Sequence, residues 1–156
     1  MQAADKGQTT IQLVGFNLKG QGYAVDIRDV QEIVPMREIT QIPNAPEHVL
    51  GAINLRGSVI PVLSLRKRFS MDEKDPDERS RILIIRLRGI LIGFLVDSVS
   101  DVVRPAPGEI EPFPPVSSPS NSGFISGIVK HGDRLLILLD MDSLLKEDDT
   151  VLSPAA

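Results

Sequence analysis

The chain has 156 residues, of which 42% are hydrophobic and 24% charged, so it is long enough for one folded domain or two very small ones. It has no cysteine, which excludes disulfides and thiolate zinc sites, and its formal net charge of −4 argues against a main role in binding phosphate backbones. Residues 1–10 lack a signal-peptide pattern, and the apolar stretch at residues 90–96 is too short to cross a bilayer, so we expect a cytoplasmic protein.

The first elements in chain order are two predicted strands. Apolar and polar residues alternate over residues 11–18 and again over residues 23–27, which is typical of half-buried strands. The alternation changes phase at Gly15, and a glycine at such a point predicts a bulge. Residues 20–22, Gly-Gln-Gly, predict the turn between the two strands.

Two short helical turns are predicted next. Residues 29–34 begin with an aspartate followed three positions later by Glu32, which is the spacing of a capping box. Residues 36–43 alternate and predict a strand. Residues 44–51 predict the second helical turn, with Gly51 at its exit.

Three apolar hairpins follow. We expect them over residues 53–65, 81–97 and 124–140, with bends at Arg56-Gly57, at Arg88-Gly89 and at residues 131–133.

The segments between the hairpins have other compositions. Residues 70–80 are polar and aperiodic and predict a linker, and residues 104–123 are rich in proline and serine and predict irregular chain. Residues 141–145 predict a last helical turn.

Two pairs of segments resemble one another. Residues 50–65 align with residues 125–140 at an offset of 75, and residues 29–34 align with residues 98–103 at an offset of 69. An internal duplication would give two small barrels of about five strands each, joined near residues 70–80 and sharing an apolar seam. The alternative is that apolar hairpins look alike by composition alone.

The sequence offers few groups for catalysis. His48 and His131 have no partners at metal-ligand spacing, and neither a phosphate-binding glycine loop nor a nucleophile-elbow motif occurs. We therefore expect no enzyme activity, no catalytic residues, no metal and no cofactor. Basic residues at 66–68 and in the strand at 81–88 leave a nucleic-acid-binding barrel as an alternative, although stacking residues are few.

Several segments in order resemble the CheW family of chemotaxis coupling proteins. They are YAVDIRDVQEIV, IPNAPEHVLGAINLRGSVIPVLSLRKRF, GFLVDSVSDVV and GDRLLILLDMDSLL, and they extend from about Thr9 to Leu145. The most specific string is N-x-R-G-x-x-x-P-V-x-x-L, which begins here at Asn54. Ser64 departs from the pattern, because the family commonly has an acidic residue there.

The resemblance implies an all-β fold of two tandem five-stranded SH3-like β-barrels with short helical turns. One domain would cover residues 9–145, with barrels at about 9–69 and 81–145 and terminal strands open to exchange between them. Residues 70–80 would be the linker, and residues 1–8 and 146–156 would be flexible tails.

The resemblance also implies a non-catalytic adaptor. It would couple the cytoplasmic tips of chemoreceptors, the methyl-accepting chemotaxis proteins, to the regulatory domain of the histidine kinase CheA. The adaptor would be cytoplasmic and peripheral to membrane-bound receptor arrays, without inserting into the membrane or binding nucleic acid. A CheW-like scaffold for pilus motility or a second-messenger pathway is a further alternative.

Site residues follow from the resemblance position by position. Those expected to bind the receptor are Val30, Glu32, Gly51, Asn54, Arg56, Gly57, Ile82 and Gly93. Those expected to face the kinase are Met36, Ile39 and Ile42.

Overall fold

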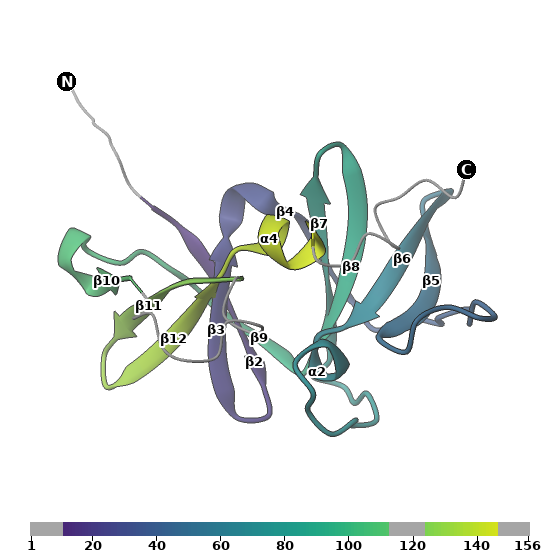
Figure 1. The fold of residues 1–156 in the computed structure, drawn as a ribbon, viewed down its shortest axis with the longest axis horizontal. Coiled ribbons are helices and arrows are strands. Elements are labelled where there is room, and N and C mark those ends of the chain that lie inside the picture. The colour runs from purple at the N-terminus through teal and green to yellow at the C-terminus, as the bar shows by residue number, and fades with distance from the viewer. Residues whose placement is uncertain (1–10, 113–123, 147–156) are drawn as a thin grey trace.

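The computed structural model describes residues 11–112 and 124–146, which form two sheets side by side (Figure 1). One sheet has six strands in the order β10-β11-β12-β3-β2-β9, and the other has five in the order β4-β7-β8-β6-β5. The fold is therefore all-β, as predicted.

The elements in chain order are β2 (Leu13–Leu18), β3 (Gln21–Asp26), the 3₁₀ turn η1 (Ile27–Asp29), β4 (Val30–Pro35), β5 (Val49–Leu55), β6 (Ser58–Ser64), α2 (Leu65–Arg68), β7 (Arg81–Leu87), β8 (Ile90–Val96), β9 (Ser98–Val103), the 3₁₀ turn η2 (Pro107–Glu109), β10 (Ile110–Glu111), β11 (Ile125–His131), β12 (Arg134–Leu139) and α4 (Met141–Lys146).

The predicted hairpin bends are confirmed. Arg56 and Gly57 have φ angles of 52° and 90°, and Arg88 and Gly89 have 52° and 78°. Two consecutive positive φ angles are the signature of the tight turn whose twist matches antiparallel strands. The ladder between β2 and β9 shifts register between Val14 and Phe16, but the extra residue lies in β9, and Gly15 pairs regularly with Ala24 of β3. The irregularity therefore lies opposite the glycine and not at Gly15, where the bulge was predicted.

Neither predicted helical turn before β5 forms a helix over its predicted range. Within residues 44–51 there is a single hydrogen-bonded turn, in which the Val49 N–H donates to the Pro46 carbonyl at 2.9 Å. A 3₁₀ turn occurs earlier, at η1, where the Asp26 side chain accepts a hydrogen bond from the Arg28 backbone N–H, and residues 30–35 form strand β4. Residues 49–51 already belong to β5. Pairing with strands distant in sequence overrides a local capping pattern.

The strand predicted over residues 36–43 is also absent, because only Thr40 forms a bridge there, to Ala52.

The first hairpins of two repeats pair in one register. Leu13 pairs with Asp26 between β2 and β3. Sixty-nine positions later, Ile82 pairs with Leu95 between β7 and β8. In the first repeat the next strand, β4, pairs with β7, and in the second repeat the next strand, β9, pairs with β2. The two ladders have corresponding registers and are irregular at the same place. The ladders thus agree with the offset of 69.

The second hairpins correspond at an offset of 76 rather than the predicted 75. Strands β5 and β11 both span seven residues, 76 positions apart, and both ladders carry a bulge next to their first pair. Because strand side chains alternate between faces, an error of one position exchanges the inner face with the outer. Ile53, 2% exposed, therefore corresponds to Val129, fully buried, and not to Ile128.

The two repeats exchange their first hairpins. The five-stranded sheet takes β4, β5 and β6 from the first repeat but β7 and β8 from the second. The six-stranded sheet takes β2 and β3 from the first repeat and the remaining strands from the second. Each sheet therefore contains strands that precede residues 70–80 and strands that follow them. The division into two sheets does not coincide with the linker, and the strands exchanged are the first hairpins.

Each sheet is closed by the chain that leaves an outer strand. After β4 the chain crosses to β5, where Thr40 bridges Ala52. After β9 the chain crosses to β11, where β10 pairs Glu111 with Ile128. Closure of this kind leaves no long exposed edge. The sixth strand is therefore the counterpart of the Thr40 bridge, which reconciles the predicted five strands with the six observed.

The largest core cluster lies between the two sheets. It joins residues of β2 and β3, such as Phe16, with residues of β7 and β8, such as Phe94, and with Met141 of α4. Smaller clusters fill each sheet separately. The shared apolar seam predicted from the sequence is thus the main core. Among the described residues, no helix has the length and apolarity needed to cross a membrane.

Candidate functional site

The predicted receptor residues Asn54, Arg56 and Gly57 lie together in the turn between β5 and β6. The Gly57 backbone N–H donates a hydrogen bond to Asn54 Oδ1 at 2.9 Å. This bond and the positive φ of Gly57 fix the turn, so that the arginine side chain projects from a rigid support. The Arg56 side chain is 69% exposed.

Glu32 joins this turn from another strand. Its carboxylate accepts a hydrogen bond from the Arg56 guanidinium, and the two form an ion pair. Glu32 lies on β4, and β4 and β5 are the two outer strands of the five-stranded sheet. The ion pair therefore links the two edges at which this sheet closes. A second contact across the same edge is weaker: Arg37 Nη1 lies 3.4 Å from the Asn54 carbonyl oxygen.

The predicted kinase-facing residues lie in the segment that closes the sheet. Met36 and Ile39 are half-buried and pack against the core of the five-stranded sheet. Ile42 is exposed. The structure thus places all three in the segment that leads to β5, and of the three only Ile42 is exposed, at 46%.

Four predicted receptor residues are not on the exposed surface. Ile82 and Gly93 are buried in the five-stranded sheet, where a Cβ at Gly93 would lie 2.9 Å from Ile82 Cγ2. Gly51 is buried with φ of 149°, and a Cβ there would lie 2.1 Å from the Thr40 carbonyl oxygen. Val30 is half-buried and packs against the seam cluster. All four support the fold where they stand.

Two exposed apolar residues lie on the strands next to the Glu32–Arg56 pair. Val59, which pairs with Asn54 on the outer face of the hairpin, is 78% exposed, and Ile33, which follows Glu32 on β4, is 39% exposed. This edge is suited to binding another protein, because it combines arginines, a carboxylate and apolar side chains on a rigid support. In the part of the chain that the structure describes, no three histidine, cysteine, aspartate or glutamate side chains converge as a metal site.

A second charged cluster anchors α2 to the end of β8. Arg66 donates two hydrogen bonds to Asp97, from Nε at 2.9 Å and from Nη2 at 2.6 Å, and both side chains are less than 20% exposed. The Lys19 backbone N–H donates a third bond to Asp97 at 2.9 Å. Burial raises the pKa of Asp97, but these hydrogen bonds outweigh it and hold the pKa below its ordinary value.

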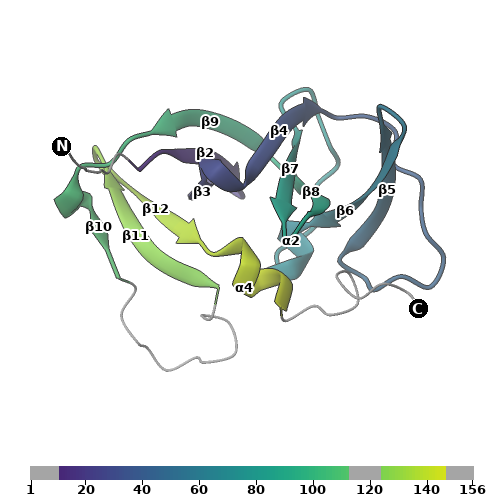
Figure 2. The ribbon, with the colours of Figure 1, turned by 90° about the horizontal axis from the view of Figure 1, so that it is seen from above.

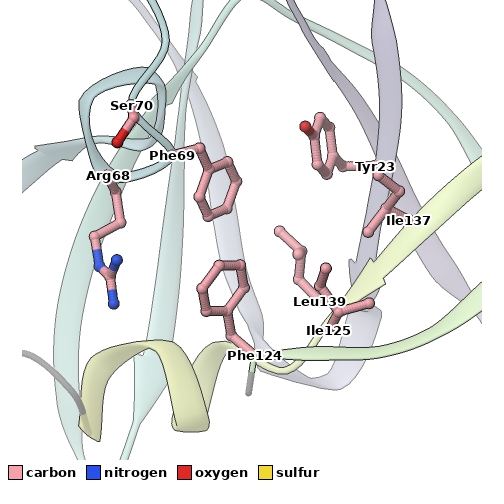
Figure 3. A pocket seen from close by; sticks show the side chains of 8 residues that line it. All are labelled: Tyr23, Arg68, Phe69, Ser70, Phe124, Ile125, Ile137 and Leu139. Atoms are coloured by element: carbon pink, nitrogen blue, oxygen red, sulfur yellow. The ribbon is translucent and has the colours of Figure 1, made fainter. Parts of the chain in front are cut away.

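Four aromatic residues form a stacked group that was not predicted from the sequence. The ring centroids of Phe16 and Tyr23 are 5.7 Å apart, those of Tyr23 and Phe69 are 5.7 Å apart, and those of Phe69 and Phe124 are 5.1 Å apart. Tyr23, Phe69 and Phe124 line one pocket (Figure 3). Their positions in sequence have no common spacing, so no local pattern indicates the stack.

Comparisons with known proteins agree on one family. The sequence model of a family described as "CheW-like domain" matches residues 12–149. The chain is 33% identical to the chemotaxis protein CheW of Helicobacter pylori over 92% of its length and 87% of that protein. It is also 33% identical to the chemotaxis protein CheW of Bacillus subtilis, over 92% of each chain.

A solved structure is similar as well. The crystal structure of the scaffolding protein TtCheW from Thermoanaerobacter tengcongensis superposes with a TM-score of 0.77 and 38% identity. The match covers 84% of this chain and 89% of that one.

Proposed function

The chain belongs to the CheW-like family and is a chemotaxis coupling adaptor, and from this premise we propose that it bridges a chemoreceptor and a CheA-type histidine kinase. The receptor would bind through its cytoplasmic tip and the kinase through its regulatory domain. The adaptor would work in the cytoplasm beside membrane-bound receptor arrays and would catalyse no reaction. The nucleic-acid and non-chemotactic alternatives are not favoured, because these relatives are named as chemotaxis proteins.

The receptor-binding surface that we propose is centred on the Glu32–Arg56 pair. The observation that carries this proposal is that the pair lies on a closed edge with most of the arginine exposed. Arginine in a fixed position can bind a partner's carboxylates or carbonyls through several donors at once. Asn54 and Gly57 would hold the turn in place.

The other four predicted receptor residues would support that surface from behind. Gly51 allows the closing segment to approach β5, while Ile82 and Gly93 pack the core beneath the sheet. Val30 would set the start of β4 against the seam.

The kinase would contact the closing segment of the same sheet. Ile42, 46% exposed, supplies an apolar contact, with Met36 and Ile39 supporting the segment from below. Val59 lies on the outer face of the adjacent hairpin and extends this apolar area.

The adaptor would act by linkage between two bound partners. A receptor change reaches the kinase through it only if its contacts differ between the receptor's signalling states. Modest interfaces of this kind are consistent with exchangeable complexes.

Receptor binding is tested by replacing Arg56 with alanine. Arg56→Ala should weaken receptor binding by about 1–3 kcal/mol, as expected for an interface anchor. Its effect on the free energy of unfolding should be small, because the side chain is mostly exposed. The measurement is co-sedimentation with receptor-bearing membranes and CheA, followed by a kinase assay and urea unfolding.

Arg28→Ala is the matched control. Arg28 is also an exposed arginine in an ion pair with a carboxylate, but it lies on η1 and its partner is Asp26. It should leave receptor binding unchanged. Equal losses in both variants, or unfolding of Arg56→Ala without loss of affinity, would refute the receptor surface.

A further inference from the structure

A pocket of about 220 Å³ lies at the seam between the two sheets. Its apolar lining comes from the six-stranded sheet and from the segment after α2, as Figure 3 shows. The six lining residues that form its walls are Tyr23, Phe69, Phe124, Ile125, Ile137 and Leu139. The pocket is larger than the cavity of about 150 Å³ that holds a benzene ring in another protein.

The pocket lies away from the proposed receptor surface. Figure 2 shows β4 and β9 along one side of the molecule and α2 and α4 along the opposite side. The pocket belongs to the side of α2, since Arg68, Phe69 and Ser70 contribute to it. Glu32 lies on β4. A ligand in the pocket would therefore use a surface separate from the Glu32–Arg56 pair.

The duplicated fold does not impose this aromatic lining. At the offset of 69, the residue that corresponds to Tyr23 is Ile92. At the offset of 76, the residue that corresponds to Phe124 is His48. Arg68 corresponds to Leu144, which is 2% exposed and fills the seam together with Ile92. One repeat thus packs aliphatic side chains where the other has aromatic rings and a pocket.

Polar groups at the pocket point to the chemistry of its ligand. The Arg68 guanidinium carbon lies 5.5 Å from the centroid of the Phe124 ring and places positive charge at the pocket. Ser70 adds a hydroxyl to the lining. Tyr23 is only 7% exposed, and no described residue forms a hydrogen bond with its hydroxyl. Burial raises the pKa of Tyr23, so at neutral pH this hydroxyl is a protonated donor.

We propose that this seam pocket is a second docking site, which takes one aromatic side chain of a partner protein segment that carries a carboxylate next to it. The ring would stack on Phe69 and Phe124, where offset aromatic pairs are favourable. The carboxylate would lie near Arg68, and the Tyr23 hydroxyl would gain an acceptor. We assign the ring to a protein segment because the chain is a coupling adaptor. Of the basic residues of α2, Arg68 lines the pocket, whereas Arg66 and Lys67 pair with Asp97 and Glu73.

The test is an NMR titration of the full chain with acetyl-Phe-Glu-amide. The peptide should shift the methyl signals of Ile125, Ile137 and Leu139 and saturate with a dissociation constant of about 1 mM. Acetyl-Phe-Lys-amide should bind at least about threefold more weakly, because it places a cation beside Arg68. Acetyl-Ala-Glu-amide should not saturate, because it lacks the ring.

Two variants separate docking from folding. Ile137→Phe fills the pocket and should abolish the peptide shifts, whereas the control Val102→Phe adds the same ring to an exposed position of β9 and should not. Tyr23→Phe should weaken the peptide about threefold without lowering the unfolding midpoint, since it removes an unpaired hydroxyl.

Three results would overturn the proposal. They are shifts spread over the surface without saturation, peptide binding that persists in a folded Ile137→Phe variant, and phenylacetate binding as tightly as the peptide. The last would assign the pocket to a free small molecule instead of a protein segment. Receptor and kinase binding need not change in any of these outcomes, so the test is independent of the proposed coupling role.

Discussion

The two sheets are built from repeats with the same strand registers, yet they close differently. The five-stranded sheet closes with a single bridge at Thr40 and the exposed ion pair of Glu32 and Arg56. The six-stranded sheet closes with the short strand β10 and an ion pair of Lys130 and Glu111, whose charged atoms are 2.5 Å apart. Closure is kept in both, while the side chains displayed at the closing edge differ.

At the seam, too, buried positions are alike in the two repeats while the binding surfaces differ. Buried positions of the two repeats correspond, as Ile53 does to Val129 and Leu65 to Met141. Among the described residues, the aromatic pocket lies beside α2, and the positions beside α4 that correspond to Tyr23 and Phe124 are Ile92 and His48. The comparison teaches that packing fixes the strand registers, whereas closing edges and helix ends can diverge and carry different binding surfaces.

The largest expected effect tests how tightly each sheet closes. Gly51→Ala should destabilise the fold by about 3 kcal/mol, because the new Cβ meets a backbone oxygen and the φ angle suits only glycine. Gly127→Ala, its counterpart, should cost about 1–2 kcal/mol, because its nearest atom, the Glu111 carbonyl oxygen at 2.8 Å, belongs to a short strand that can shift. Urea unfolding measures both, and equal losses would contradict a tighter closure at Thr40.

The second largest difference in the free energy of unfolding is expected between the ion pairs that hold the two short helices, α2 and α4. Arg66→Ala removes both side-chain hydrogen bonds from the largely buried Asp97 and should cost about 2–3 kcal/mol. Asp142 corresponds to Arg66 and pairs with Arg88, but both of these side chains are more than 40% exposed. Asp142→Ala should therefore cost less than about 1 kcal/mol in the same unfolding experiment. A larger loss for Asp142→Ala would mean that exposure does not decide the strength of the anchors.

The Arg66 anchor should also depend on pH. The pKa of Asp97 is lower in the folded chain than in the unfolded one, so its stabilisation is complete above the unfolded value and is lost as pH falls through the folded value. The stability gap between the natural chain and Asp97→Asn should be constant near pH 7 and narrow below about pH 4. Urea unfolding across that range measures it, and a gap that widens in acid would reverse the assigned sign.

The smallest effects concern two exposed hairpin positions. Val59 and Leu135 correspond to one another and are 78% and 57% exposed. Replacing either with serine should change the free energy of unfolding by less than about 0.5 kcal/mol. Only Val59→Ser should weaken a pull-down with the kinase regulatory domain, and a loss confined to Leu135→Ser would move the kinase surface to the other sheet.

The sequence was informative wherever a feature depends on neighbouring residues. The turns at Arg56-Gly57 and Arg88-Gly89 follow from glycine and period-two alternation, and the structure confirms them. The helical turn expected at residues 29–34 fails because β4 pairs with β7, about fifty residues away, which a capping pattern cannot report. The resemblance left an exchange of terminal strands open, but local patterns cannot decide it, since both arrangements satisfy the same alternation of residues.

The candidate site was predictable only as a set of positions. The resemblance selected Glu32 and Arg56 separately, and only the structure joins them across an edge. It also selected Ile82 and Gly93, which the structure buries, because a sequence pattern does not distinguish a contact from the packing beneath it. The aromatic stack depends on rings brought together from β3, the end of α2 and the start of β11.

The exchanged hairpins set the order in which a chain emerging from the ribosome can finish its fold. The five-stranded sheet is complete once β8 has been made, whereas β2 and β3, the first strands synthesised, must wait for β9 and β12. Until then β2 and β3 pair only with each other and can pack only against β7 and β8, so the face that packs on β9, β11 and β12 stays uncovered. Exposed apolar surface of this kind makes nascent chains prone to aggregation or chaperone binding. The hairpin that is synthesised first is thus among the last elements to reach its final packing.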